Sequence, residues 1–239
     1  MFDNLPTRFY EQFIAGEGLA LMKTGLIATL EVSFVALVIG IIIGTIAALM
    51  KIAQGKTPTG KFLCKAANIT ATIYITLFRG TPVVVQLLLA YFGIMGPLGV
   101  NPLYVAFAAL GLNSGAYVAE IIRSGIMSVD RGQMEAGRSL GLSYGVTMFY
   151  IVIPQAIKNI LPALGNELIA LIKETSVVGF IAVFDMTRAA RSIISTTYDA
   201  FVPYLVLALA YLTIVIIATK GVSMLEGRLR RSDYRKKFS

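Results

Sequence analysis

Five apolar regions, separated by short polar or glycine-rich segments, dominate the chain. They cover residues 25–50, 62–95, 103–126, 162–178 and 201–219. A helix rises 1.5 Å per residue, so the first region alone extends over about 39 Å, which exceeds the hydrocarbon thickness of a bilayer. The pattern predicts an all-α polytopic membrane protein with about five transmembrane helices.

Two of these regions carry signs of a break. Arg79 and Pro82 interrupt the second region, and an arginine within a span is costly unless it faces protein or water. We therefore expect a kinked or two-part helix there. Pro162 is expected to start the fourth helix. Gly179 and the residues around Asp185 then predict a break, followed by a non-cytoplasmic segment that ends near Asp199.

Composition supports the membrane assignment and excludes several kinds of site. The 239 residues are 56% hydrophobic and 14% charged, with a mean hydropathy of +0.76. The single cysteine, Cys64, excludes a disulfide framework, and without histidine we expect no metal site. Residues 55–61 match the spacing of a phosphate-binding loop, but Phe62 replaces the magnesium-binding hydroxyl, so no ATP site is expected. Asn68-Ile69-Thr70 forms a glycosylation triplet that we attribute to chance.

Basic residues are distributed unevenly between the two sides of the membrane. With five spans and an outside N-terminus, fifteen Lys and Arg residues fall on the cytoplasmic side and four fall outside. This bias predicts a multi-pass plasma-membrane protein with a cytoplasmic C-terminus. It also explains the net charge of +8 by topology and attraction to anionic membrane lipids, without nucleic-acid binding. Residues 1–23 are expected to form an interfacial N-terminus, and residues 220–239 a basic cytoplasmic tail.

A polar segment between the third and fourth apolar regions has local signals for two helices. Asp130 and Gln133 have the spacing of a helix N-terminus, and Gly141 offers a left-handed helix end. Ser143 is expected to cap a second helix, which Pro154 should break or bend. By local physics alone, the segment equally fits an ordinary helical hairpin on the surface.

The spacing of this segment resembles the EAA loop of bacterial ABC importer permeases. Glu135-Ala136-Gly137 is followed by Gly141 and later by a segment that ends at Pro154. Further stretches are similar to the polar amino-acid uptake branch of these permeases: residues 78–82 with Gln86, residues 113–120 and residues 164–167. Two positions depart from the usual pattern, since Gly137 replaces the second alanine of the triplet and Ile153 replaces a leucine.

The resemblance implies a type I importer fold and a division of labour between subunits. Residues 1–239 would form one permease domain, with a cytoplasmic coupling loop at 128–160. The residues that would contact the ATPase are Glu135, Ala136, Gly137, Arg138 and Gly141. This chain would hold no cofactor, because two partner ATPase subunits would bind ATP and magnesium. A second permease, either identical or similar, and an extracytoplasmic amino-acid-binding protein would complete the importer.

Polar residues within the apolar regions are candidates for the substrate path. A zwitterionic amino acid needs an acceptor for its ammonium group and donors for its carboxylate. The path candidates are Asn166, Glu167, Gln86, Asn113 and Thr81; the candidates for a gate or for buried charge pairing are Arg79, Lys173 and Glu174. For each path residue, the alternative is a hydrogen bond between helices that holds the bundle together.

Two other functional classes compete with the importer permease. A self-sufficient secondary transporter or channel would also carry buried charges, but it usually shows inverted repeats, which this sequence lacks. An intramembrane enzyme is disfavoured because the chain has no histidine and no recognised nucleophile motif. We therefore predict a non-enzymatic permease that moves polar or charged amino acids by alternating access.

Overall fold

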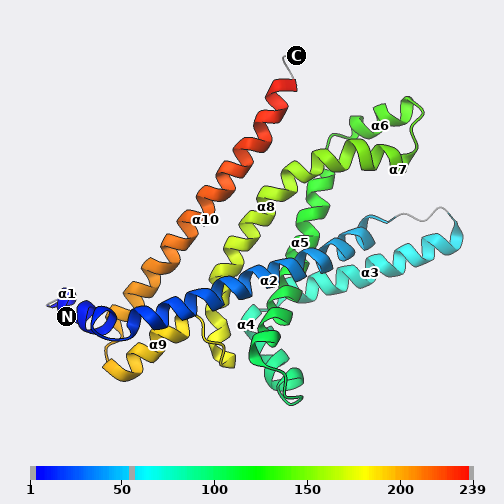
Figure 1. The fold of residues 1–239 in the computed structure, drawn as a ribbon. Coiled ribbons are helices and arrows are strands. Elements are labelled where there is room, and N and C mark those ends of the chain that lie inside the picture. Colours follow the sequence, from blue (N-terminus) through cyan, green and yellow to red (C-terminus); the bar gives the residue numbers. More distant parts are fainter. Residues whose placement is uncertain (1–3, 54–56, 237–239) are drawn as a thin grey trace. The chain divides into compact units, whose positions relative to one another are not determined.

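The structure, a computed structural model, describes residues 4–53 and 57–236, with side chains as far as Leu229. Every regular element in these ranges is helical (Figure 1). The elements are α1 (Leu5–Phe9), η1 (Tyr10–Ile14), α2 (Gly18–Ile52), α3 (Pro58–Gly80), α4 (Val83–Leu88), η2 (Leu89–Met95), α5 (Pro102–Met127), α6 (Arg131–Ser139), α7 (Tyr144–Thr147), η3 (Met148–Val152), α8 (Ile153–Glu174), η4 (Thr175–Ile181), α9 (Met186–Thr197) and α10 (Phe201–Lys236). The segment η4 is a 3₁₀ helix, and η1, η2 and η3 are π-helical.

Four helical stretches are long and apolar enough to cross a membrane. They are Gly18–Ile52, Pro102–Met127, Tyr144–Ile181 and Phe201–Leu229. A bent pair, Pro58–Gly80 with Val83–Met95, makes five if it is counted as one span. The expected all-α membrane fold with about five spans is confirmed, and the predicted break lies at Thr81 and Pro82.

Several predicted helix boundaries are wrong. The first long helix begins at Gly18 and not near Gly25, and the last one continues well past Thr219. Pro162 does not start a helix but lies inside α8. Membrane helices tolerate an internal proline because neighbouring groups can satisfy the freed carbonyl.

Pro154 likewise neither ends nor breaks its helix. The wider π-helical turn of η3 lies directly before Ile153, and α8 starts there and passes through Pro154. In this turn the Ile153 N–H bonds to the Met148 carbonyl five residues earlier, and the distortion accommodates a proline that cannot donate a backbone hydrogen bond. The second helix also begins earlier than the apolar region 62–95 predicts, because α3 starts at Pro58. Of the phosphate-loop-like residues, Gly55 and Lys56 lie outside the described ranges.

The chain divides into two compact units; four of the boundaries fall inside α2, α5, α8 and α10, and one falls at the end of α3. Unit 1 contains residues 1–39, 81–111 and 168–217; unit 2 contains residues 40–80, 112–167 and 218–239. Each unit has its own buried core.

The core of unit 1 combines large side chains with two alanines, Ala189 and Ala190. Phe13, Met186, Ile193 and Leu207 are buried in one cluster. The N-terminal segment is attached to this unit by Asp199, which forms an ion pair with Arg8 and accepts a hydrogen bond of 2.7 Å from Gln12 Nε2. The predicted break lies between η4, which ends at Ile181, and α9, which begins at Met186, but the sequence did not indicate that the segment after the break is a helix.

A buried carboxylate starts α9. Asp185 is fully buried, and its two oxygens accept hydrogen bonds of 3.0 Å from the N–H groups of Thr187 and Arg188. Burial raises the pKa of Asp185, and these backbone donors oppose the shift. Two glycines leave room for Asp185. A Cβ on Gly25 would lie 2.7 Å from the Asp185 backbone, and a Cβ on Gly179 would lie 2.9 Å from Asp185 Oδ1.

The core of unit 2 is built from small side chains. Ala47, Ala71, Ala116 and Ala119 cluster around Ile75. Small residues let helix backbones approach closely, which is how membrane helices pack in the absence of a strong hydrophobic drive.

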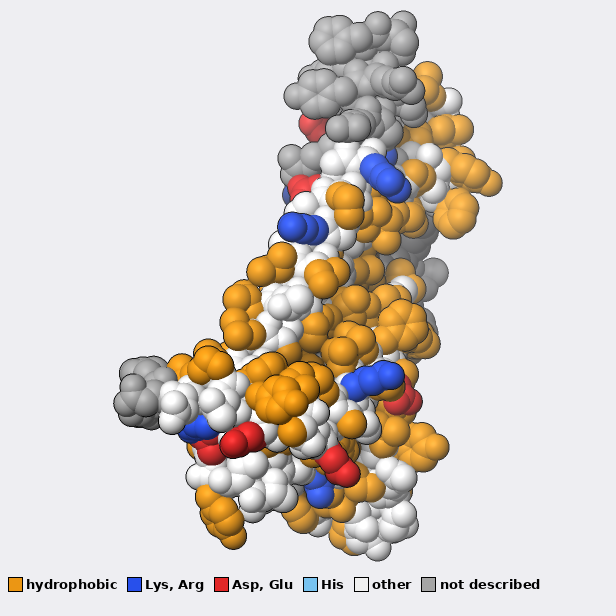
Figure 2. Space-filling model, turned by 60° about the vertical axis from the view of Figure 1, so that its left-hand side comes forward, with side chains coloured by type: hydrophobic (Ala, Val, Ile, Leu, Met, Phe, Trp, Pro, Cys, Tyr) orange, Lys and Arg blue, Asp and Glu red, His pale blue; other side chains and the backbone are white. Residues whose placement is uncertain are grey.

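The outer surface of the long helices is apolar. Figure 2 shows hydrophobic side chains covering much of the visible surface, with charged side chains gathered toward its lower part and its upper end. On α2, the exposed side chains include Phe34, Ile42 and Ile46. A soluble protein rarely exposes so many large apolar side chains, so this surface fits contact with lipid.

Candidate coupling loop and substrate path

The helix α6 begins and ends as its sequence predicts. Asp130 caps it, with Oδ1 accepting a 2.6 Å hydrogen bond from Gly132 N–H. Gly141 follows the helix with a φ of +83°, a conformation that glycine adopts without steric cost. Gln133 differs from the expected cap, because its side-chain oxygen accepts a 3.3 Å hydrogen bond from Gln155. This contact joins α6 to α8 across the loop.

One face of α6 is open and the other is held against the next helix. Glu135, Ala136 and Arg138 are exposed, whereas Gly137 is buried. A Cβ on Gly137 would lie 2.5 Å from Thr147 Cγ2, so glycine at this position lets α6 lie directly on the following helix. This contact is the physical reason for the departure from alanine that the sequence shows here.

The second half of the loop is capped as expected and exposes apolar side chains. Ser143 Oγ accepts a 3.3 Å hydrogen bond from Val146 N–H at the start of α7. Leu140 is 81% exposed, and Phe149 and Tyr150 are 64% and 72% exposed. None of the three was among the predicted coupling residues; Phe149 and Tyr150 belong to the apolar run at 148–153, which indicated an apolar surface at this point of the loop.

Charged and polar contacts fix the base of the loop. Glu120 accepts a 2.7 Å hydrogen bond from Arg123, which lies three positions later on the same helix, and a 3.1 Å hydrogen bond from Lys51 Nζ on another helix. Asn159 Nδ2 donates to Ser128 Oγ over 2.8 Å and so connects α8 to the end of α5. These contacts stabilise the ends of the membrane helices from which the loop begins.

In unit 2, three of the predicted path residues have different environments. Glu167 accepts a 2.7 Å hydrogen bond from Ser114 Oγ, and Asn166 beside it is exposed. Asn113 is only 3% exposed and donates to the Phe78 carbonyl over 3.1 Å. Its amide therefore joins α5 to α3, which is the structural alternative to a path role.

Arg79 also belongs to unit 2 and lies over an aromatic ring. Its guanidinium carbon is 5.2 Å from the centroid of the Tyr117 ring, within the range of a cation–π interaction. Because Lys173 and Glu174 belong to unit 1, pairing between them and Arg79 stays a prediction.

In unit 1, the predicted residues fall into two groups. Gln86 Nε2 donates to the carbonyl and the hydroxyl of Thr81 over 3.0 and 2.7 Å, across the helix break. Lys173 and Glu174 line a cavity of about 390 Å³; its other lining residues are Val83, Ala170, Ser176 and Val177. This cavity offers both charges that a zwitterion requires.

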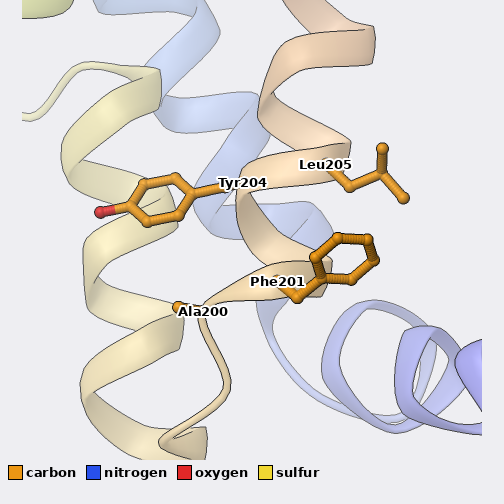
Figure 3. A pocket seen from close by; sticks show the side chains of 4 residues that line it. All are labelled: Ala200, Phe201, Tyr204 and Leu205. Atoms are coloured by element: carbon orange, nitrogen blue, oxygen red, sulfur yellow. The ribbon is translucent and has the colours of Figure 1, made fainter. Parts of the chain in front are cut away.

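Another cavity of unit 1 has no such polar groups. It has a volume of about 440 Å³ and lies at the start of α10, lined by Ala200, Phe201, Tyr204 and Leu205 (Figure 3). The ring of Tyr204 points to one side of the helix, and Phe201 and Leu205 point to the other. Without a charged side chain, this cavity is a poor match for an amino acid.

Comparison with known proteins supports the family that the loop suggested. Residues 40–231 match the family described as "Binding-protein-dependent transport system inner membrane component". The chain is 40% identical over 211 residues to the arginine transport system permease protein ArtQ of Bacillus subtilis (strain 168), covering 87% of this chain and 92% of ArtQ. It is 34% identical over 213 residues to the glutamine transport system permease protein GlnP of Escherichia coli (strain K12), covering 88% and 93% of the two chains.

A solved structure agrees with these relatives. A crystal structure of an amino acid ABC transporter with histidines contains a chain that is 43% identical, with a TM-score of 0.83, covering 95% of this chain and 99% of that one. In a binding-protein-dependent system, the membrane component works with a binding protein and with a separate ATPase subunit that hydrolyses ATP, so it holds no nucleotide site of its own. The chain belongs to the inner membrane components of binding-protein-dependent transport systems, in the polar amino-acid branch of ABC importer permeases.

Proposed function

We propose that this permease moves polar or charged amino acids inward by alternating access and is driven through the loop from Asp130 to Pro154. The observation that carries the proposal is α6, a capped helix with one exposed face and with Gly137 packed against Thr147 on the other. A helix held in this way moves as a rigid piece. It can therefore transmit the approach and separation of two ATPases to the helices that flank the loop.

The exposed side of α6 fits a docking role. Glu135 and Arg138 offer charges of both signs, and Leu140 adds an apolar contact. Interfaces between proteins combine such apolar anchors with a polar rim. Gly141 sets the direction in which the chain leaves the docked helix.

The remaining features of the assembly follow from topology and symmetry. The distribution of Lys and Arg supports an outside N-terminus and a cytoplasmic loop and C-terminus. We expect two permease subunits, as a homodimer or with a similar chain, together with two ATPases and an external binding protein. The interfacial segment 1–23, the tail 220–239 and the single permease domain are part of the same proposal.

The candidate residues for substrate contact are ranked by their environments. Glu167 and Asn166 stay the first choices in unit 2, while the buried hydrogen bond of Asn113 favours a structural role. In unit 1, the cavity beside Lys173 and Glu174 supports substrate contact more strongly than the locally bonded Gln86 and Thr81 do. The named cargoes of the relatives, arginine and glutamine, are both polar amino acids.

The test is transport by the reconstituted importer. Proteoliposomes that contain this chain, its ATPase and its binding protein are assayed for uptake of labelled arginine and glutamine and for stimulated ATP hydrolysis. With Glu135→Ala or Gly141→Arg, we expect uptake and stimulated hydrolysis to fall together by roughly tenfold, which is within the usual range of coupling free energies.

The matched control is Glu17→Ala, which removes an exposed carboxylate outside the loop. It should leave both activities unchanged, and size-exclusion profiles should show that all variants are folded. Uptake that needs no ATPase and is insensitive to both loop substitutions would instead identify a secondary transporter or channel.

A further inference from the structure

One side of α3 carries a continuous row of polar residues. The row, here called the α3 stripe, contains Lys61, Lys65, Asn68, Thr72, Thr76 and Arg79. Their spacing of three or four residues places all six on one face of the helix. All six are exposed, and Thr72 Oγ1 donates a 3.2 Å hydrogen bond to Asn68 Oδ1.

Of the other two faces of α3, one is buried within unit 2 and the other is exposed and apolar. Ala71 and Ile75 are buried in the core of unit 2, and Tyr74 OH donates to the Leu112 carbonyl over 2.6 Å. A third face is exposed and apolar, with Ile73 and Leu77 61% and 53% exposed. The apolar exposed face fits lipid, so the α3 stripe lies between a buried face and a lipid face.

The α3 stripe does not suit lipid. From Lys61 to Arg79 it extends over about 27 Å, close to the thickness of the hydrocarbon layer. Lysine and arginine near the ends can reach the headgroups, but Asn68 and Thr72 lie between them. An amide exposed to hydrocarbon is costly, and polar residues in spans usually face protein or water.

The charges of the α3 stripe indicate whether it faces another protein subunit or water. If two copies of this chain were related by a two-fold axis along the membrane normal, a stripe that met its own copy would place Lys65 against Lys65 and Arg79 against Arg79. Like charges in a dry interface repel each other. Water between the two stripes removes this conflict.

We propose that the α3 stripe is the wall of a water-filled path and binds the α-carboxylate of the substrate. The inference rests on the proposed import of amino acids. The stripe has cations at both ends, hydroxyl and amide donors between them and no acidic residue. It therefore complements the one anionic group that all α-amino acids share, and leaves recognition of the side chain to other residues.

Cysteine accessibility tests the path directly, because Cys64 is the only native cysteine. In a Cys64→Ser background, Thr72→Cys and Thr76→Cys probe the stripe, and Ile73→Cys and Leu77→Cys on the same helix are the matched controls. In the complete importer, an anionic water-soluble thiosulfonate should modify the stripe cysteines about tenfold faster or more, since thiolates form in water and not in lipid. L-Arginine should slow this modification, whereas agmatine, which is arginine without its carboxylate, should not.

Three results would overturn the inference. Equal, slow modification of Thr72→Cys and Ile73→Cys would show that the stripe faces lipid. Rapid disulfide formation between two Thr72→Cys copies, without modification by the reagent, would identify a dry subunit interface. Equal protection by L-arginine and agmatine would show that the α3 stripe does not bind the α-carboxylate. The difference between stripe and control cysteines needs no uptake, so a complex that fails to import amino acids would contradict the proposed function without affecting that difference.

Discussion

The buried clusters of the two units differ in the size of their side chains. The cluster of unit 1 contains large side chains such as Phe13, Met186 and Leu207 beside two alanines, whereas the cluster of unit 2 consists of four alanines and Ile75. In unit 2, a Cβ on Gly44 would lie 2.7 Å from two atoms of Val118. A core of large side chains is damaged by truncation, and closely packed backbones are damaged by enlargement. Truncation of a large buried side chain therefore tests unit 1, and enlargement of a closely packed glycine such as Gly44 tests unit 2.

The largest expected effect comes from truncation in unit 1. Met186→Ala removes a side chain that is 1% exposed and should lower the free energy of unfolding by about 2–5 kcal/mol through lost burial and a residual cavity. Thermal unfolding in detergent measures the change. A loss below that of an exposed control, Met127→Ala, would show that unit 1 does not depend on its large side chains.

Enlargement in unit 2 should have the next largest effect. Gly44→Ala should lower the free energy of unfolding by about 1–3 kcal/mol, because the Cβ meets Val118 and the Gly115 carbonyl. Gly221→Ala is the control in the same unit, since a Cβ there has no neighbour within 4 Å. It should be neutral or stabilising, because alanine favours a helix over glycine. Equal effects of the two substitutions would contradict the close packing.

A smaller effect is expected at the contact between α6 and the helix that follows it. Gly137→Ala should cost about 1–2 kcal/mol and reduce the stimulation of the ATPase, because the new Cβ meets Thr147. Adding Thr147→Ala removes both contacting side-chain atoms and should restore stability and stimulation. A double-mutant cycle measures this coupling, for which we expect about 0.5–3 kcal/mol. Strictly additive effects would indicate that α6 does not rest on Thr147.

The smallest effect concerns the attachment of the N-terminal segment in unit 1. Burial opposes ionisation of Asp199, but hydrogen bonds from Arg8, Gln12 and Phe201 outweigh it and hold the pKa of Asp199 below its usual value. Because the folded pKa is lowered, the carboxylate adds stability above its unfolded pKa and loses it as the pH falls through the folded one. The difference in melting temperature between wild type and Asp199→Asn should therefore shrink between neutral and strongly acidic pH. A constant difference would exclude the ionised carboxylate as the cause.

Local features of the fold were predictable from sequence, and contacts distant in sequence were not. Asp130, Ser143 and Gly141 act within a few residues of themselves, and each was predicted correctly. The contact of Lys51 with Glu120 joins residues 69 positions apart, and no local pattern indicates it. Pro162 was misplaced because its cost in a helix depends on neighbours that the sequence does not show.

The exposed faces of the spanning helices were harder to predict than the ends of the loop helices. Asn113 was a path candidate because it is an amide within an apolar region. In the structure its side chain forms a hydrogen bond between α5 and α3. The α3 stripe was not predicted, because Asn68 was considered only within a glycosylation triplet and the threonines of α3 were not placed on a helix face. The sequence does not show which side chains of α3 are exposed. Their exposure depends on which faces of α3 the neighbouring helices cover.

The surroundings of Asp185 have a consequence for how this family diverges. Gly25 and Gly179 have no room for a side chain only because the α9 cap stands where it does. A larger residue at position 179 requires the side chain at 185 to shrink or move, whereas a larger residue at position 25 requires the backbone at 185 and 186 to move. We therefore expect positions 179 and 185 to covary among related permeases, and position 25 to stay glycine wherever the backbone at the start of α9 is kept.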